Sequence, residues 1–382
     1  MQVAGKQKTV GREGPIAWLA YFALRVVICI LQALPIEACE TFASCMAVLA
    51  NDVLRIRGRL VEENLRHAFP QVEARQRRKI AFEMWKHLVL MICELAHIPR
   101  KLHDSNWRDY IEMSDDEVRT LVGYLLSPRP VVIVSGHYGN FEVGGIVSGL
   151  LGFPTYTVAR PLDNVYLHRY LTDFRERTGQ FMLEKQGSAG QIDDILRSGG
   201  TMVLLGDQSA GPKGVWVQFF GRPASCHKAV ALFSLVNDAP MLLAHSIRVR
   251  RPFHFRIGVS ACYDPARESI GGMRQLTQWY NDHLEAIIRV APEQYWWLHN
   301  RWKSAPARPA KAKPHPAATP PTQVVVAAVA PAIDQGDMAA SGIPAAPVQE
   351  RSQRVDGPSA PTPTTQPDTE SSTPSPTNRP AP

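Results

Sequence analysis

Short apolar strands that alternate with helical segments between residues 131 and 290 restrict this chain to a mixed α/β fold. Residues 131–135 (VVIVS) and 201–205 (TMVLL) are typical of buried strands. Further strands are expected at 155–159, 240–248 and 253–260, and helices at 140–151, 163–178, 191–197, 227–236 and 269–290. Strands and helices in this order predict a mostly buried β-sheet layered by helices.

The chain changes composition at Ser304. From there to residue 382 it is rich in Pro, Ala, Thr and Ser, contains no aromatic residue, and balances its basic with its acidic side chains. Such a sequence cannot bury enough apolar surface to offset the entropy of ordering, so we expect a disordered tail over 304–382. The net charge of +7 therefore belongs to the residues before it.

An apolar run at 15–34 (PIAWLAYFALRVVICILQAL) opens a helical N-terminal region that continues at 36–54 and 72–97. Twenty such residues reach across about 30 Å of hydrocarbon. The run is longer than a usual signal-peptide core, has Arg25 in its middle and lacks a clear cleavage site. We expect a membrane-associated helix over residues 1–35. A spanning helix, an in-plane helix and a buried helix of a soluble core all remain open.

The basic balance of the chain fits the anionic surface of a membrane. Nucleic acid would accept the same charge, but no nucleic-acid-binding motif is present, so no nucleic acid partner is expected. The six cysteines include no C-x-x-C pair and no Cys/His cluster with zinc spacing. No metal site is predicted.

The segment SGHYGNFE at 135–142 carries the clearest chemical pattern. A buried strand ends in a glycine-flanked His137, and a helix is expected just beyond it. Glu142 could reach the imidazole only if the chain turned between them, as Gly136 and Gly139 would allow. Glu142 would then accept the Nδ1–H and leave Nε2 as a base toward a hydroxyl. The alternative is that His137 is a capping or packing residue.

Two later blocks follow strands and combine turn residues with charged side chains. They are ARPLDN at 159–164 and GDQSAGPKG at 206–214, and the latter leads into VWVQFF at 215–220. Arginine and lysine in such turns suit phosphate recognition. The aromatic residues of VWVQFF could line a groove for an acyl chain, or belong to a strand with alternating burial.

Together these segments resemble the bacterial lipid A biosynthesis (late) acyltransferases, within the lysophospholipid acyltransferase-like superfamily. The blocks that carry the resemblance are ENLRHAFP at 63–70, GHYGNFE at 136–142, RPLDN at 160–164, GDQSAGPKGVWVQFFGRPAS at 206–225 and HNRWK at 299–303. They occur in colinear order over residues 15–303.

The resemblance implies a glycerolipid acyltransferase-like fold, an acyltransferase domain over 36–303, and roles for individual residues. His137 matches the catalytic base and Glu142 its charge-relay partner. Substrate-binding positions are implied for Arg160, Asn164, Arg175, Asp207, Gln208 and Lys213.

The implied reaction moves a fatty acyl chain from an acyl-carrier-protein or CoA thioester to a hydroxyl of a membrane glycolipid, without metal or redox cofactor. A lipid A precursor is the expected acceptor, and a phosphatidylinositol mannoside or a lysophospholipid is the alternative. A non-catalytic membrane adaptor is a further alternative. Because the thioester donors are cytoplasmic, the catalytic domain is expected on the cytoplasmic face of the inner membrane.

Overall fold

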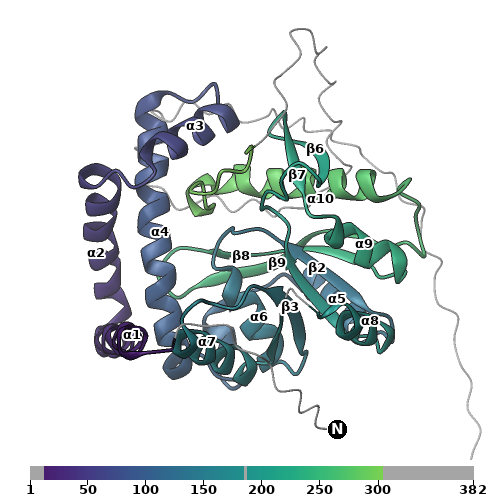
Figure 1. Cartoon of the computed structure of the whole chain (residues 1–382), viewed down its shortest axis with the longest axis horizontal. Helices are drawn as coiled ribbons and strands as arrows, with labels where there is room; N and C mark the ends of the chain where they lie inside the picture. Colours follow the sequence, from purple (N-terminus) through teal and green to yellow (C-terminus); the bar gives the residue numbers. More distant parts are fainter. Residues whose placement is uncertain (1–12, 185–186, 304–382) are drawn as a thin grey trace, which may run out of the picture. The chain divides into compact units, whose positions relative to one another are not determined.

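The computed structural model describes residues 13–184 and 187–303, and the predicted tail lies outside this part. A seven-stranded sheet, with the strand order β1-β9-β8-β2-β5-β3-β4, forms its centre (Figure 1). The strands are β1 Ile111–Glu112, β2 Val131–Ser135, β3 Thr155–Ala159, β4 Gln180–Glu184, β5 Thr201–Leu205, β8 Met241–Arg248 and β9 Phe255–Tyr263.

The sheet is mostly parallel. The strands β8, β2, β5, β3 and β4 run in one direction, whereas β9 pairs antiparallel with β8 and carries β1 with it. A separate antiparallel hairpin joins β6 Val215–Phe219 to β7 Arg222–Cys226. The predicted mixed α/β class is thereby confirmed. Burial of the sheet is complete only at β2, whereas β3 and β4 each have a single buried residue.

Ten α-helices flank these strands within the described residues. They are α1 Pro15–Ala33, α2 Ile36–Ala47, α3 Gly58–Ala68, α4 Ala74–Lys101, α5 Asp115–Leu125, α6 Phe141–Leu150, α7 Val165–Arg177, α8 Ala189–Arg197, α9 Lys228–Val236 and α10 Met273–Val290. A π-helix, η1 Val48–Val53, continues α2, and short 3-10 turns lie at η2 Trp107–Asp109 and η3 Pro292–Gln294.

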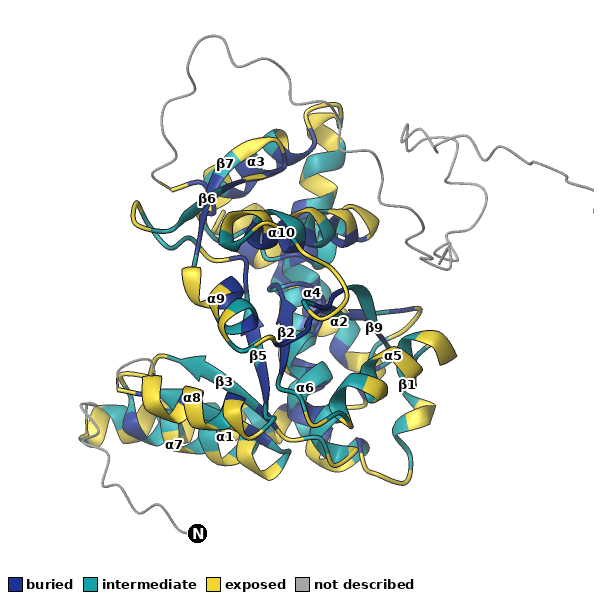
Figure 2. Ribbon diagram, turned by 90° about the vertical axis from the view of Figure 1, so that its right-hand side faces the viewer, coloured by how far each residue is buried: buried dark blue, intermediate teal, exposed yellow. Residues whose placement is uncertain are grey.

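Side chains on β2 alternate between two cores. Val132 and Val134 face the cluster that contains α8, α9 and α10 residues, while Val131 and Ile133 face the α5 side. Because all five residues of β2 are buried, this strand lies at the centre of the layered fold (Figure 2). Its carboxyl end is therefore held rigidly from both faces.

The helical N-terminus packs against α4. The buried positions of α2 recur every three or four residues, at Ile36, Cys39, Ala43 and Ala47, which gives one continuous face toward α4. The sequence predicted a helix at 72–97, but α4 continues to Lys101 through Pro99. Pro99 has no N–H to donate to the Leu95 carbonyl, so α4 loses one hydrogen bond two residues before its end.

Candidate active site

The β2–β5 register places two functional side chains at the same edge of the sheet. Ser135 at the end of β2 pairs with Leu205 at the end of β5, and the Gly206 N–H donates to the Ser135 carbonyl over 2.8 Å. His137 and Asp207 each follow two residues beyond these paired ends. Carboxyl ends of parallel strands are common binding edges. The register therefore makes His137 and Asp207 neighbours.

Asp207 holds His137 with both carboxylate oxygens. The imidazole Nδ1 lies 2.8 Å from Oδ1, and the backbone N–H of His137 donates to Oδ2 over 2.8 Å. With Nδ1 donating, Nε2 is left as the acceptor, and the side-chain amide of Gln208 lies 3.4 Å from it at an exposed position. The His137 side chain is 10% exposed and that of Asp207 4%. The imidazole therefore reaches the surface while its partner stays covered.

The electrostatics keep Asp207 ionised. Burial raises the pKa of this carboxyl, but the charge and N–H groups of His137, together with the Arg301 guanidinium, lower it by more. The resulting pKa lies below the ordinary value of an aspartate. A carboxylate at this position fixes the imidazole tautomer and stabilises an imidazolium when one forms.

The predicted contact between Glu142 and His137 is wrong. The carboxylate that binds His137 belongs to Asp207, and Glu142 binds Arg175 instead. Glu142 lies in the first turn of α6 and forms a two-pronged ion pair with Arg175, with one bond of 3.1 Å from Nε to Oε2 and a shorter one from Nη2 to Oε1. Burial lowers the pKa of Arg175, but the bonds to Glu142 raise it by more. Glu142 points to α7 because the helix begins at Phe141, directly after the turn.

The chain segment 295–301 forms a further wall of the site, and only its residues 299–301 belong to a block that carries the resemblance. The Trp296 ring lies 4.7 Å from the His137 ring, centre to centre, and its backbone N–H donates to the His137 carbonyl over 3.0 Å. His299 Nε2 accepts the Ser209 N–H at 3.0 Å. The fully covered Arg301 binds the Ser225 carbonyl over 2.6 Å. This segment therefore packs against the His137–Asp207 pair and the residues around it.

The remaining predicted substrate positions are dispersed. Arg160 is exposed in the turn after β3, and Lys213 is exposed in the turn before β6. Asn164 caps α7, accepting the N–H groups of Tyr166 and Leu167, and donates to the carbonyl of Ala17 over 2.8 Å. Of the predicted substrate positions, Asp207 and Gln208 are the ones that hydrogen-bond to His137.

The aromatic residues of VWVQFF belong to a strand with alternating burial. Val217 and Phe219 on β6 are buried, while Gln218 is exposed. Phe220, directly after β6, is also buried and contacts Phe69 and Trp297 edge-on. Phe219 and Phe220 are core residues and do not line an open groove.

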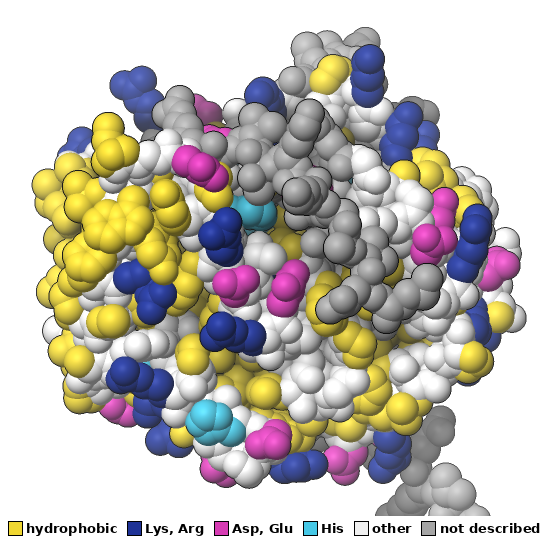
Figure 3. Space-filling model, turned by 60° about the horizontal axis from the view of Figure 1, so that its bottom comes forward, with side chains coloured by type: hydrophobic (Ala, Val, Ile, Leu, Met, Phe, Trp, Pro, Cys, Tyr) yellow, Lys and Arg dark blue, Asp and Glu magenta, His cyan; other side chains and the backbone are white. Residues whose placement is uncertain are grey.

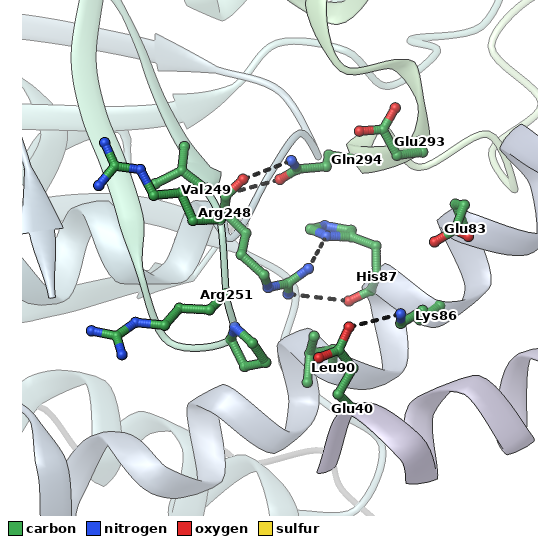
Figure 4. A pocket seen from close by; sticks show the side chains of 12 residues that line it. Glu40, Glu83, Lys86, His87, Leu90, Arg248, Val249, Arg251, Glu293 and Gln294 are labelled. Atoms are coloured by element: carbon green, nitrogen blue, oxygen red, sulfur yellow. Dashed lines mark hydrogen bonds and ion pairs between the residues drawn. The ribbon is translucent and has the colours of Figure 1, made fainter. Parts of the chain in front are cut away.

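A second polar cluster supports the loop of residues 136–140 from behind. Arg248 donates to both oxygens of Glu94, which is fully buried. It also donates to His87 Nδ1 over 2.8 Å (Figure 4). His87 Nε2 then lies 3.2 Å from the Gly139 carbonyl, and Asn140 donates to Glu94 over 3.0 Å. Burial and the Arg248 charge hold the pKa of His87 well below its ordinary value, so this imidazole is neutral.

His87 and Arg248 of this second cluster line a cavity of about 270 Å³. Its lining mixes both charges, and the carboxylate of Glu40 holds Lys86 at 2.8 Å (Figure 4). Within residues 13–184 and 187–303, no three His, Cys, Asp or Glu side chains are arranged to hold a metal ion.

The comparisons with known proteins agree on one family. The family model for bacterial lipid A biosynthesis acyltransferase matches residues 6–304. The lipid A biosynthesis palmitoleoyltransferase of Escherichia coli (strain K12) is 26% identical over 296 residues, which cover 76% of this chain and 93% of that protein. The lipid A biosynthesis lauroyltransferase of the same strain is 24% identical and covers 76% and 94%.

Similarity to solved structures is weaker. The 1-acyl-sn-glycerophosphate (LPA) acyltransferase PlsC from Thermotoga maritima matches over 66% of this chain and 95% of its own. The sequence identity is 9% and the TM-score 0.32. Values this low carry no conclusion about the detailed fold.

Proposed function

Because the chain belongs to the bacterial lipid A biosynthesis acyltransferase family, we propose that it moves a fatty acyl chain from a thioester to a hydroxyl of a lipid A precursor. The chain is an acyltransferase of lipid A biosynthesis. The observation that carries the mechanism is the imidazole of His137, held at Nδ1 by Asp207 and reaching the surface through Nε2.

The reaction uses His137 first as a base and then as an acid. Nε2 takes the hydroxyl proton as the oxygen attacks the thioester carbonyl, which forms a C–O bond. The C–S bond then breaks, and the imidazolium returns its proton to the departing thiolate. Asp207 stabilises the imidazolium during this interval, a task for which its lowered pKa suits it. No covalent acyl-enzyme is required.

The Glu142–Arg175 pair takes a separate role in this proposal. Arg175 is 25% exposed, and Glu142 fixes its guanidinium with two bonds. A guanidinium held in this way is suited to an anionic group of the substrate. Glu142 therefore acts through Arg175 as a positioning residue, and Gln208, beside Nε2, lies where the attacking hydroxyl would approach.

The donor is proposed to be an acyl-carrier-protein or CoA thioester, and the acceptor a membrane glycolipid. Since both donors are cytoplasmic, the proposal includes a catalytic domain on the cytoplasmic face of the inner membrane. The apolar helix α1 has the length and composition of a membrane segment, and Leu31 is its buried residue, which supports membrane association.

The direct test is transfer by a purified His137→Ala variant, with His103→Ala as the matched control, since His103 is exposed in the loop after α4. We expect His137→Ala to lower turnover by a factor of at least about 1,000 without unfolding, and His103→Ala to leave it unchanged. Near-normal transfer by the His137 variant would refute the base. Parallel assays with acyl-carrier-protein and CoA thioesters, and with competing lipid acceptors, identify the substrates.

A further inference from the structure

The contacts of α1 decide how this helix meets a lipid bilayer. Its least exposed positions are the half-buried Ala17, Tyr21, Leu24 and Ile28 and the buried Leu31, which recur at intervals of three or four residues. This spacing gives one stripe that faces the protein along the whole helix. The helix is therefore attached to the domain from end to end, and does not project from it.

Specific bonds fasten both ends of that stripe. Near the start, the Ala17 carbonyl accepts the side-chain amide of Asn164 over 2.8 Å. Near the end, Gln32 donates to the Ala96 carbonyl over 2.8 Å, and the Leu34 carbonyl lies 3.0 Å from His97 Nε2. The fastened length from residue 17 to residue 34 is about 25 Å at 1.5 Å per residue.

The partners of α1 are too polar to enter hydrocarbon with it. One is α7 (VYLHRYLTDFRER), in which Arg169, Asp173, Glu176 and Arg177 are exposed, and the other is the end of α4, where Arg100 is exposed. Placing a charged side chain at the centre of a bilayer is unfavourable, because the charge loses its hydration. A spanning α1 would carry several of these with it. The helix can meet the bilayer only lengthwise.

The opposite side of α1 is exposed and apolar. Ile16, Leu19, Val26 and Ile30 point away from the fastened stripe, and they are 85, 60, 41 and 56% exposed. Exposed apolar residues continue onto α2 and η1, at Phe42, Val48, Leu49 and Val53. Figure 3 shows hydrophobic side chains gathered on the left, the side on which α1 and α2 lie in Figure 1. A patch of this extent requires a cover.

The boundary between α1 and α7 has the chemistry of a headgroup layer. Arg25 donates to the Tyr21 hydroxyl over 3.0 Å, and its guanidinium lies 4.8 Å from the centre of the Tyr170 ring. Tyrosine and arginine concentrate where one side of a helix is in hydrocarbon and the other is wet. The cover that suits this surface is a lipid leaflet, from which the acceptor would also come.

We propose that α1 lies in the plane of the membrane, with the Ile16–Leu19–Val26–Ile30 side in the acyl chains of one leaflet and the domain at the surface of the same leaflet. This mode deepens the proposed function, because it keeps residues 13–303 on one side of the bilayer together with a soluble thioester donor. A spanning α1 would separate the segment before it from the domain.

Depth measurements separate the two modes. The exposed Cys29 and Cys45 are replaced by serine, and spin labels are placed singly at Leu19, Val26 and Ile30 in the full chain, with Leu126 as an exposed control on another helix end. The protein is reconstituted into phosphatidylethanolamine–phosphatidylglycerol vesicles, and oxygen and nickel-chelate accessibilities give the depth of each label.

We expect Leu19 and Ile30 to lie at the same depth within about 5 Å, below the headgroups, while Leu126 stays in water. A spanning helix would separate them by about 16 Å, which is 11 residues at 1.5 Å each. That result, or labels shielded from both lipid and water by a second copy, would overturn the proposal.

A binding assay supplies an independent measure. The double variant L19D/V26D should bind the same vesicles at least tenfold more weakly, while L126D should bind as the parent does. Equal binding by all three proteins would overturn the proposal. Neither readout depends on acyl transfer, so transfer in detergent micelles tests the proposed function separately.

Discussion

The two sides of the loop at 136–140 carry similar side chains in opposite surroundings. At the front, His137 pairs with Asp207 and keeps an exposed nitrogen. At the back, His87 lies between Arg248 and the Gly139 carbonyl, and Glu94 beneath it is fully buried. The Nε2 of His137 is bonded by an exposed amide side chain that a substrate hydroxyl could replace, whereas both nitrogens of His87 are bonded within the protein. The front is thus suited to chemistry and the back to rigidity.

Asp207→Asn is the variant expected to distinguish the front of the loop from the back most strongly. The amide preserves the shape of the side chain but cannot stabilise an imidazolium, so turnover should fall by about 1,000- to 10,000-fold. The loss of unfolding free energy should be smaller than that in Arg248→Met. Steady-state kinetics and calorimetry on the same preparation measure both, and a variant that keeps a tenth of the parent activity would show that Asp207 has another role.

Replacement of Arg248 by methionine should have the opposite effect, with its main loss in unfolding free energy and not in turnover. It leaves the Glu94 carboxylate buried without its partner, which costs about 3–5 kcal/mol of unfolding free energy. Denaturant titration measures the loss. Arg250→Met is the matched control, because its side chain is 75% exposed beside Glu112 and should change stability by less than about 1 kcal/mol. Equal losses of unfolding free energy in the two variants would contradict a special stabilising role for the buried Arg248–Glu94 pair.

A smaller effect is expected from Glu142→Gln. Since Glu142 contacts Arg175 and makes no hydrogen bond to His137 in the described structure, its loss should raise the KM for the lipid acceptor more than it lowers kcat. A change of about tenfold in kcat/KM is expected. If kcat instead falls as far as in Asp207→Asn, Glu142 belongs to the front of the loop after all.

The smallest effect concerns stability at low pH. His137 and Arg301 hold the pKa of Asp207 below its ordinary value of 3.8, although burial alone would raise it. The stabilisation it contributes is therefore complete above that ordinary value and is lost as the pH falls through the lower folded value. The difference in unfolding free energy between the parent and Asp207→Asn should shrink below about pH 4. A difference that grows on acidification would contradict the assignment.

Local patterns predicted the strands at 131–135 and 201–205 and the position of His137 after the first of them. The partner of His137 could not be predicted, because it depends on the register between strands 70 residues apart. The equivalent placement of Gly-His after one buried strand and Gly-Asp after another was the available signal. Glu142 was predicted as the partner because it is close to His137 in sequence. Helix α6 begins at Phe141, however, and Glu142 in its first turn contacts α7 instead.

Some secondary structure was present in the sequence but overlooked. Ser114 caps the unpredicted α5: its hydroxyl oxygen accepts the Glu117 N–H over 3.3 Å, and the hydroxyl donates to the Glu117 carboxylate over 2.6 Å. Asn164 was interpreted as a substrate residue, although an asparagine before an amphipathic segment is also a typical helix cap. The link from its amide to Ala17 is tertiary and could not be foreseen.

The protonation of the His137 ring tests the central claim most directly. In ¹⁵N-histidine-labelled protein, with the His137 signals assigned by their absence in His137→Gln, the neutral ring is predicted to carry its proton on Nδ1 and to leave Nε2 bare. Asp207→Asn should disturb that preference, and Glu142→Gln should preserve it. A proton found on Nε2 in the parent, or a preference that follows Glu142 and not Asp207, would contradict the account.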